Sequence, residues 1–472
     1  MVIEISQETF DDAVKENVEI LGLGEEEAVE EAVKQFEAQG VDLSKIIKDQ
    51  MSKQQYEEIT AAVQKVEQLQ KTKGDVDNIN KALDDLRLEC DKGIQYKIAA
   101  GKAEAYHILL NTYEAFSDKT VKINALKTLL SLMTKQPDLL DDRGVAFIIN
   151  NLKVQPQDVE IQKLILKWAK ECCVMHEKNR QKIYDSHIVD VIKNQLDDLT
   201  PVEIIRETLS VFRALVLDDD VRVEFGRAHE HARVIASETL CSIMNLLTRF
   251  RGEEQLNLDI IVTLTALMVR AEFCKKVEDA GGLELIKTVM ETFCNSGRII
   301  RQSFKLIKAL AGNDECKAHM PKKGYVSILR DSINASMDSA QTVTAGLSAV
   351  AALTLRSPEN SKQFFDEGIP EVIVTAMKKH DSDKAVQKTA SWAIRNMVSR
   401  SKYQSAKFIE IGAEEALRND LKNFKEIEYD VKAALRDLGC KVNLKEEWTG
   451  KGGALTNRNA KRDNENDNEY ED

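Results

Sequence analysis

Proline is scarce in this 472-residue chain, which has only 6, while charged residues make up 31% of it. Neither figure suits a proline-rich disordered chain or a loop-rich β protein. Long stretches consist instead of alanine, leucine, glutamate, lysine and glutamine at helical spacing. The composition therefore predicts an all-α protein.

Long apolar runs are also missing. The longest, such as VTLTALMV at 262–269, is far too short to cross a bilayer. The N-terminal MVIEISQETFDD is acidic and does not have the basic and apolar regions of a secretory signal. We therefore expect no membrane partner and no secretion.

Cysteine motifs are absent as well. The 8 cysteines are scattered, the only close pair is Cys172 and Cys173, and no CxxC occurs. This pattern argues against zinc ribbons and thioredoxin-type redox sites. Reduced, buried thiols in a cytoplasmic or nuclear protein are the simpler interpretation.

No sequence motif of a catalytic site is present. The chain lacks GxxxxGK[ST], GxSxG and HExxH, and its 7 histidines are dispersed. His229 and His231 stand two residues apart, which does not place them on one helix face, so we expect a structural role there and no metal. The net charge of −13 disfavours nucleic acid as a partner. We predict no enzyme, no catalytic residue, no cofactor and no metal.

What the chain does contain is a repeated stripe of small or aliphatic residues at −3, −2, +1 and +2 around a central position zero. The central residues are Thr128, Glu171, Ala214, Ala266, Ala309, Ala352 and Asn396. The steps between neighbours are 43, 43, 52, 43, 43 and 44 residues. A period near 43 is typical of armadillo and HEAT repeats.

A glycine follows position zero by 15 or 16 residues in most copies: Gly144, Gly281, Gly324, Gly368 and Gly412, with Gly101 extending the pattern one step earlier. Each predicts a tight turn between two short helices. The 52-residue step predicts an insertion of about nine residues in one repeat. Stacked copies would cover each other's apolar faces and wind into a right-handed superhelix of about eight repeats.

The ends of the chain differ from the repeats. We assign residues 1–49 to an acidic helical arm, 50–74 to a helical connector, 75–444 to the solenoid and 445–472 to a disordered acidic tail. The apolar stripe of Val29, Val33 and Phe36 favours an arm that caps the first repeat. The alternative is an arm that occupies the groove of the solenoid.

Several stretches carry a more specific signal. They are ISQETFDDAVKENVEILGLGEEEAVEEAVKQFEAQGVDLSKI, DDDVRVEFGRAHEHARVIA and EWTGKGG. With the glycine turns, they resemble members of the armadillo-repeat family from about residue 5 to about residue 452. The resemblance implies a helical solenoid with no established enzymatic activity, and it implies no particular binding residues.

In this solenoid the last helix of each repeat would line a concave groove, with positions −4, 0 and +4 facing it. Nuclear-import adaptors of the armadillo class repeat a tryptophan–asparagine pair at −4 and 0. Here only the last repeat has both, Trp392 and Asn396, so binding of basic nuclear-localisation peptides is not supported.

Basic residues in the C-terminal half of the predicted groove suggest a different ligand. A basic groove attracts acidic segments, and arginine binds carboxylates through two hydrogen bonds. We predict that an acidic or phosphorylated peptide binds at Arg270, Lys305, Arg356, Trp392, Asn396 and Arg400. The alternative is that these are ordinary solvated residues and that Trp392 packs against the next repeat.

The function expected from these patterns is that of a monomeric, non-catalytic scaffold or adaptor for a protein or peptide partner. A carrier that exchanges its cargo is the alternative. A carrier needs a second ligand that accelerates cargo release, whereas a scaffold does not.

Overall fold

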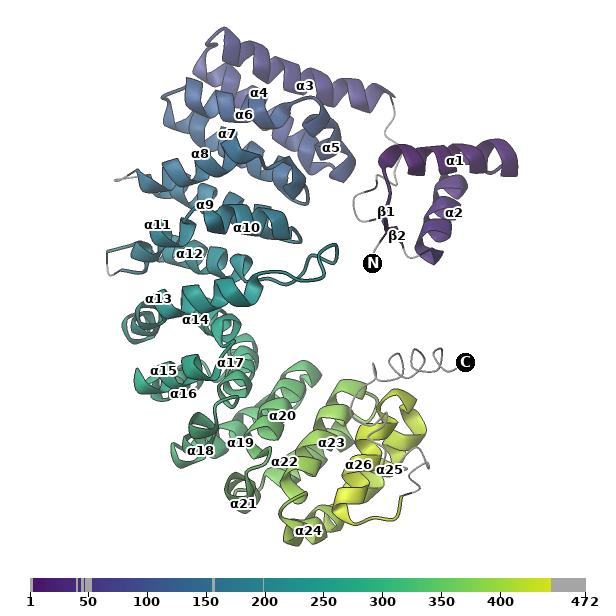
Figure 1. Ribbon diagram of the computed structural model, residues 1–472, viewed down its shortest axis with the longest axis vertical. Helices are drawn as coiled ribbons and strands as arrows, with labels where there is room; N and C mark the ends of the chain where they lie inside the picture. The colour runs from purple at the N-terminus through teal and green to yellow at the C-terminus, as the bar shows by residue number, and fades with distance from the viewer. Residues whose placement is uncertain are drawn as a thin grey trace, which may run out of the picture. The chain divides into compact units, whose positions relative to one another are not determined.

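The computed structural model describes residues 3–39, 41–43, 46, 53–154, 158–197 and 199–442. The regular secondary structure of these residues is helical, apart from two strands of two residues each. The strands, β1 (Ile3–Glu4) and β2 (Val41–Asp42), pair in parallel (Figure 1). Contacts divide the chain into two compact units, Met1–Thr239 and Leu240–Asp472. The predicted tail, 445–472, lies outside the described residues.

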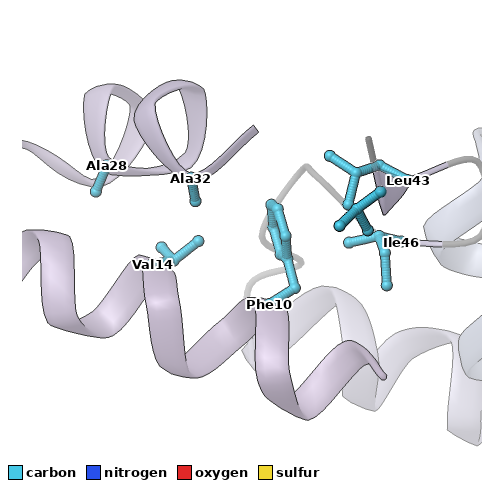
Figure 2. Packing of buried hydrophobic residues seen from close by; sticks show 7 residues of the cluster. Phe10, Val14, Ala28, Ala32, Leu43 and Ile46 are labelled. Atoms are coloured by element: carbon cyan, nitrogen blue, oxygen red, sulfur yellow. The ribbon is translucent and has the colours of Figure 1, made fainter. Parts of the chain in front are cut away.

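The N-terminal arm has a hydrophobic core of its own. Helices α1 (Gln7–Leu21) and α2 (Glu25–Ala38) pack on each other and bury Phe10 and Val14 (Figure 2). Val29, Val33 and Phe36 pack against the same cluster. The stripe that favoured a cap on the first repeat is therefore covered within the arm.

The rest of the first unit is a run of short helices. Its elements are α3 (Lys53–Lys71), α4 (Val76–Asp91), α5 (Ile94–Lys102), α6 (Ala105–Ala115), α7 (Lys119–Met133), η1 (Pro137–Leu139), α8 (Asp142–Lys153), α9 (Val159–Cys173), α10 (Glu177–Asp185), α11 (Ile188–Ile192), η2 (Lys193–Leu196), α12 (Val202–Leu215) and α13 (Ala228–Arg249), which continues into the second unit. Helix α3 differs from the expected connector, because it packs on α4, α5 and α6 and buries Ile59, Val63 and Val66.

The second unit repeats three helices with little variation. Its elements are α14 (Glu254–Leu267), α15 (Ala271–Asp279), α16 (Gly282–Thr292), α17 (Gly297–Leu310), α18 (Asp314–Lys322), α19 (Tyr325–Ala335), α20 (Ala340–Thr354), α21 (Pro358–Asp366), α22 (Ile369–Lys379), α23 (Lys384–Val398), η3 (Lys402–Gln404), α24 (Ser405–Glu410), α25 (Ala413–Asn423), η4 (Lys425–Ile427) and α26 (Glu428–Leu438). No described helix has the length and apolarity to cross a membrane.

The long final helix of each repeat stacks on the next. Helices α4, α7, α9 and α12 pack in that order in the first unit, as do α14, α17, α20, α23 and α26 in the second. All seven position-zero residues lie on these third helices. The all-α armadillo solenoid predicted from the repeat period is confirmed.

Acidic and hydroxyl side chains fix where several third helices begin. Asp118, Asp158 and Asp383 each accept backbone N–H groups of the first turn, and Ser339 does the same for α20. Such caps satisfy amides that have no partner within the helix. The positions of the third helices along the chain are thus determined by polar N-terminal capping residues as well as by the apolar stripe.

The glycine turns are confirmed in the second unit. Gly281, Gly324, Gly368 and Gly412 precede α16, α19, α22 and α25 with φ of +76°, +81°, +81° and +98°. In this left-handed region a Cβ is strained.

The glycine prediction is wrong in the first unit. Gly144 lies inside α8, where an added Cβ would stand 2.0 Å from the Tyr106 hydroxyl oxygen, and Gly101 lies inside α5. Glu104 and His187 adopt the left-handed conformation before α6 and α11 instead. Glycine is therefore required at position 144 by the close approach of the Tyr106 side chain, and not by a left-handed turn.

The irregular repeat replaces its first helix by a loop, residues 216–227, which precedes the 22-residue α13. Arg180, only 1% exposed, binds Glu177 and Asp219 and also donates to the Cys173 carbonyl. Asp220 accepts the Glu177 backbone N–H at 2.8 Å. The loop is thereby fixed to α10 by the Arg180–Asp219 ion pair and by the hydrogen bond to Asp220.

Candidate functional site

A basic tract in the second unit consists of the third helices α17 and α23, which carry basic residues, and of the uncharged α20 between them. Helices α17, α20 and α23 pack side by side and contain no aspartate or glutamate. Their basic residues are Arg298, Arg301, Lys305, Lys308, Lys384, Lys388 and Arg395. In a chain of net charge −13, these helices form a local region of opposite sign.

Lys305 is the predicted site residue that lies as expected. It is exposed on α17, at the position that Ser348 and Trp392 hold on α20 and α23. Because the three helices stack in order, these side chains form one row. Position zero on the same three helices is occupied by Ala309, Ala352 and Asn396. The two alanines are small residues, and they lie in a second row next to that of Lys305.

The three predicted arginines lie beyond the ends of the third helices, and their assignment to the helix face is wrong. Arg270 is the N-cap residue of α15, Arg356 stands between α20 and α21, and Arg400 follows α23. Helices α14, α20 and α23 end one or two residues after position zero, so position +4 falls in the turn. All three side chains are exposed at the edge of the stack.

Arg356 occupies this turn in the left-handed conformation, with φ of +55°. It also lies close to an acid of the preceding repeat. The ion pair with Lys317, and secondarily the charge of Arg356, lower the pKa of Asp314. Asp314 and Arg356 are both exposed to solvent.

Trp392 packs against the next repeat, as the alternative interpretation predicted. Its indole N–H donates to Asp430 Oδ1 on α26 at 2.8 Å, and the side chain is only partly exposed. Lys388 Nζ lies 5.1 Å from the ring centroid and 3.9 Å from Asp430 Oδ2. The polar edge of the tryptophan is therefore used within the protein.

Asn396 points back to the preceding repeat. Its side-chain amide donates to the Ala351 carbonyl at 2.8 Å. Thr128, the position-zero residue of α7, makes an equivalent bond of 3.0 Å to the Leu83 carbonyl. Both bonds span 45 residues, so polar residues at position zero link neighbouring third helices.

The sequence interpretation missed the cations on the helices themselves. Arg298 and Lys308 are exposed on α17, and Arg301 donates to Gln341 on α20. Arg395 forms an ion pair with Asp437 on α26 at 3.3 Å. The basic tract therefore ends where it meets the acidic residues of α26. Counting acids along each predicted third helix would have found it, together with α7, which also contains no aspartate or glutamate.

The nearest approach to a catalytic arrangement is Cys316, Glu278 and His319. The Cys316 thiol donates to Glu278 Oε2 at 3.3 Å, and His319 Nδ1 lies 2.6 Å from Glu278 Oε1. Burial, together with Glu278, raises the pKa of the Cys316 thiol to about 12. A thiolate nucleophile is disfavoured there.

His231 has the structural role expected of it. It is buried, donates from Nδ1 to the Leu215 carbonyl at 2.9 Å and stacks on Tyr184. His229 is exposed. In the described part of the chain, no group of three or more His, Cys, Asp or Glu side chains is placed to hold a metal ion.

Comparison with known proteins decides the family. The ARMC6 family model matches residues 56–457, and the model of the armadillo repeat-containing protein 6 N-terminal domain matches residues 3–83. The chain belongs to the armadillo repeat-containing protein 6 family.

Two relatives cover nearly the whole length. The armadillo repeat-containing protein 6 homolog of Drosophila melanogaster is 40% identical, over 94% of this chain and 97% of its own. Armadillo repeat-containing protein 6 of Homo sapiens is 31% identical, over 96% of this chain and 94% of its own.

Two solved structures share the fold alone. An engineered protein superposes with a TM-score of 0.66 at 17% identity, over 93% of this chain and 100% of its own. A structure from work on a phosphorylation switch in the interaction between cadherin and beta-catenin has a TM-score of 0.56 at 13% identity, covering 77% of this chain and 66% of its own.

Proposed function

We propose that this member of the family is a non-catalytic scaffold whose second unit binds an acidic or phosphorylated segment of a protein partner. The observation that carries the proposal is the absence of acidic residues from α17, α20 and α23 in an otherwise acidic chain. An armadillo fold is consistent with protein partners, as in the beta-catenin neighbour.

The geometry suggests how such a segment would bind. The row of Ala309 and Ala352 leaves room for a peptide backbone, while Lys305 and the edge arginines Arg356 and Arg400 supply charge beside it. Exposed cations steer an acidic ligand and are screened by salt. Because the indole N–H of Trp392 is already bonded, only its apolar surface would contact the ligand.

The test is binding of a fluorescent glutamate-rich peptide, compared with a lysine-rich peptide of equal length. We expect the acidic peptide to bind, with affinity that falls as salt rises. Arg356→Glu/Arg400→Glu should weaken it about tenfold or more, since reversed charges repel the ligand.

The matched control is Lys322→Glu/Lys362→Glu, which reverses two exposed cations on α18 and α21, outside the third helices. This variant has the same net charge as the first. Equal weakening by both variants, or no binding of the acidic peptide by the unchanged protein, would contradict the proposal.

We propose further that the protein acts as a monomer in the cytoplasm and nucleus, away from membranes and nucleic acid. The described part of the chain has free cysteines, and the buried ones are Cys90, Cys172, Cys173, Cys274 and Cys316. Unpaired thiols suit a reducing compartment. Fractionation of cells and light scattering of the purified protein test these statements.

A further inference from the structure

A cavity of about 270 Å³ lies between α22, α23 and α25 in the second unit. It is separate from the basic tract, because it opens between the second helices of two neighbouring repeats. Its lining residues are Met377, Lys378, Asp381, Gln387, Gly412, Glu415, Ala416, Asn419 and Asp420.

One wall of the cavity holds a buried carboxyl group. Asp420 on α25 is 3% exposed, and its Oδ2 has no hydrogen-bond partner among the described residues. Burial, with a smaller contribution from the charge of Asp381, raises the pKa of Asp420 to about 7. A buried acceptor without a donor costs free energy, which a donating ligand would recover.

A second buried acceptor comes from α23. Gln387 is 1% exposed, and its side-chain NH₂ donates to the Met377 and His380 carbonyls at 2.9 and 2.7 Å. Two carbonyl partners fix the orientation of the amide, because a flipped amide would set oxygen against oxygen. Gln387 Oε1 therefore remains an acceptor, and it too has no partner among the described residues.

The charged groups around the cavity define the ligand further. Asp381 and Glu415 are exposed lining residues and add negative charge to that of Asp420. Lys378 is the one lysine or arginine among the described lining residues, and its ammonium donates to the Ile411 carbonyl at 2.9 Å. The free groups are thus acceptors in an acidic environment, which a cation with N–H donors would satisfy.

We propose that this cavity binds a primary ammonium group, carried by a lysine side chain of a partner or by a small alkylamine. Calcium or magnesium needs a fuller set of oxygen ligands, and no group of three or more acidic, histidine or cysteine side chains among the described residues is placed to hold a metal ion. Asp420 and Gln387 would supply the acceptors for the ammonium.

The experiment uses the full chain with [¹³C]methyl-methionine, because Met377 lines the cavity. Titration with n-butylammonium should shift the Met377 methyl signal in a saturable way. A parallel titration with Nα-acetyl-lysine amide distinguishes the sources: binding of both probes supports a lysine side chain, and binding of n-butylammonium alone supports a small amine.

Asp420→Asn should weaken n-butylammonium binding about tenfold or more, because it removes the charge and adds a donor. Its midpoint of thermal unfolding should not fall, which separates lost binding from unfolding. Asp366→Asn, at an exposed aspartate outside the cavity, is the matched control. A cavity that takes only water, with no saturable shift, or equal binding by Asp420→Asn would overturn the proposal.

Discussion

Several polar side chains in this protein bond to the backbone about one repeat away. Asn360 donates to the Lys317 carbonyl, Asn179 to the Pro137 carbonyl, and the Tyr325 hydroxyl to the Leu283 carbonyl, at separations of 42 or 43 residues. Asn396 follows the same rule. An asparagine in such a position therefore indicates a hydrogen bond between stacked repeats, and does not by itself indicate a ligand-binding site.

Substitution of one turn glycine measures the cost of the left-handed turn. Gly368→Ala should lower the free energy of unfolding by about 1 kcal/mol, because a Cβ is strained at φ of +81° although no atom crowds it closely. Urea unfolding gives this value. Gly297→Ala, at the open first position of α17, should cause no loss, and a similar loss in both variants would contradict the explanation.

The sequence predicted the repeats well where residue type alone determines the local conformation. It predicted them less well where contacts with residues distant in sequence determine that conformation. The stripe and the turn glycines of the second unit follow from residue type. Glu104 and His187 in left-handed turns do not, because those residues resist that conformation and are held in it by their surroundings. The edge position of Arg400 depends on where α23 ends, and helix ends are weakly encoded.

At the scale of elements, the loop of residues 216–227 is the main departure from the repeat. The sequence predicted an insertion in this repeat, but not the hydrogen bonds that hold this loop in place. Asp220 accepts hydrogen bonds from Arg222 and from the Glu177 backbone N–H, and Arg222 also donates to the Met175 carbonyl. Glu177 and Met175 lie 43 and 47 residues from the loop residues that they bind, so no local pattern shows these two bonds. The loop is accordingly an ordered element.

This anchoring predicts a pH dependence. Burial opposes ionisation, but hydrogen bonds from Arg222 and the Glu177 and Arg222 amides prevail and lower the pKa of Asp220 from 3.8 to about 2. A lowered folded-state pKa stabilises the fold above the unfolded value, and the stabilisation is lost as pH falls from about 4 through 2. It amounts to about 2 kcal/mol at neutral pH.

Asp220→Asn should therefore be less stable than the unchanged protein at pH 7, by up to about 2 kcal/mol, with the difference shrinking toward pH 3. Urea unfolding at the two pH values measures it. Asp218→Asn, at an exposed neighbouring aspartate, is the control. A difference that stays constant with pH would show that the Asp220 charge is not responsible.

At the scale of the whole molecule, the arm and the solenoid have separate hydrophobic cores. The arm buries Phe10, Val14, Ala28 and Ala32 in a cluster made of its own residues. Helix α3, by contrast, contributes Ile59 and Val63 to its contacts with α4, α5 and α6. The first packed helix of the solenoid is thus α3, which needs no arm to cover its stripe.

Removal of residues 1–46 should leave the main unfolding transition of the remaining chain unchanged, because the deleted core is internal to the arm. Circular dichroism during heating measures this midpoint. A large fall would favour the capping interpretation. Crosslinks from the arm to residues 300–400 in the intact protein would instead favour occupation of the groove.

The position-zero bonds have a consequence for how this gene can change. The acceptors of Thr128 and Asn396 are main-chain oxygens, at Leu83 and Ala351, and every amino acid supplies such an oxygen. Duplication or excision of one unit of about 43 codons would therefore present a suitable acceptor whatever its side chain. The hydrogen bonds of Thr128 and Asn396 would therefore survive a change in the number of repeats.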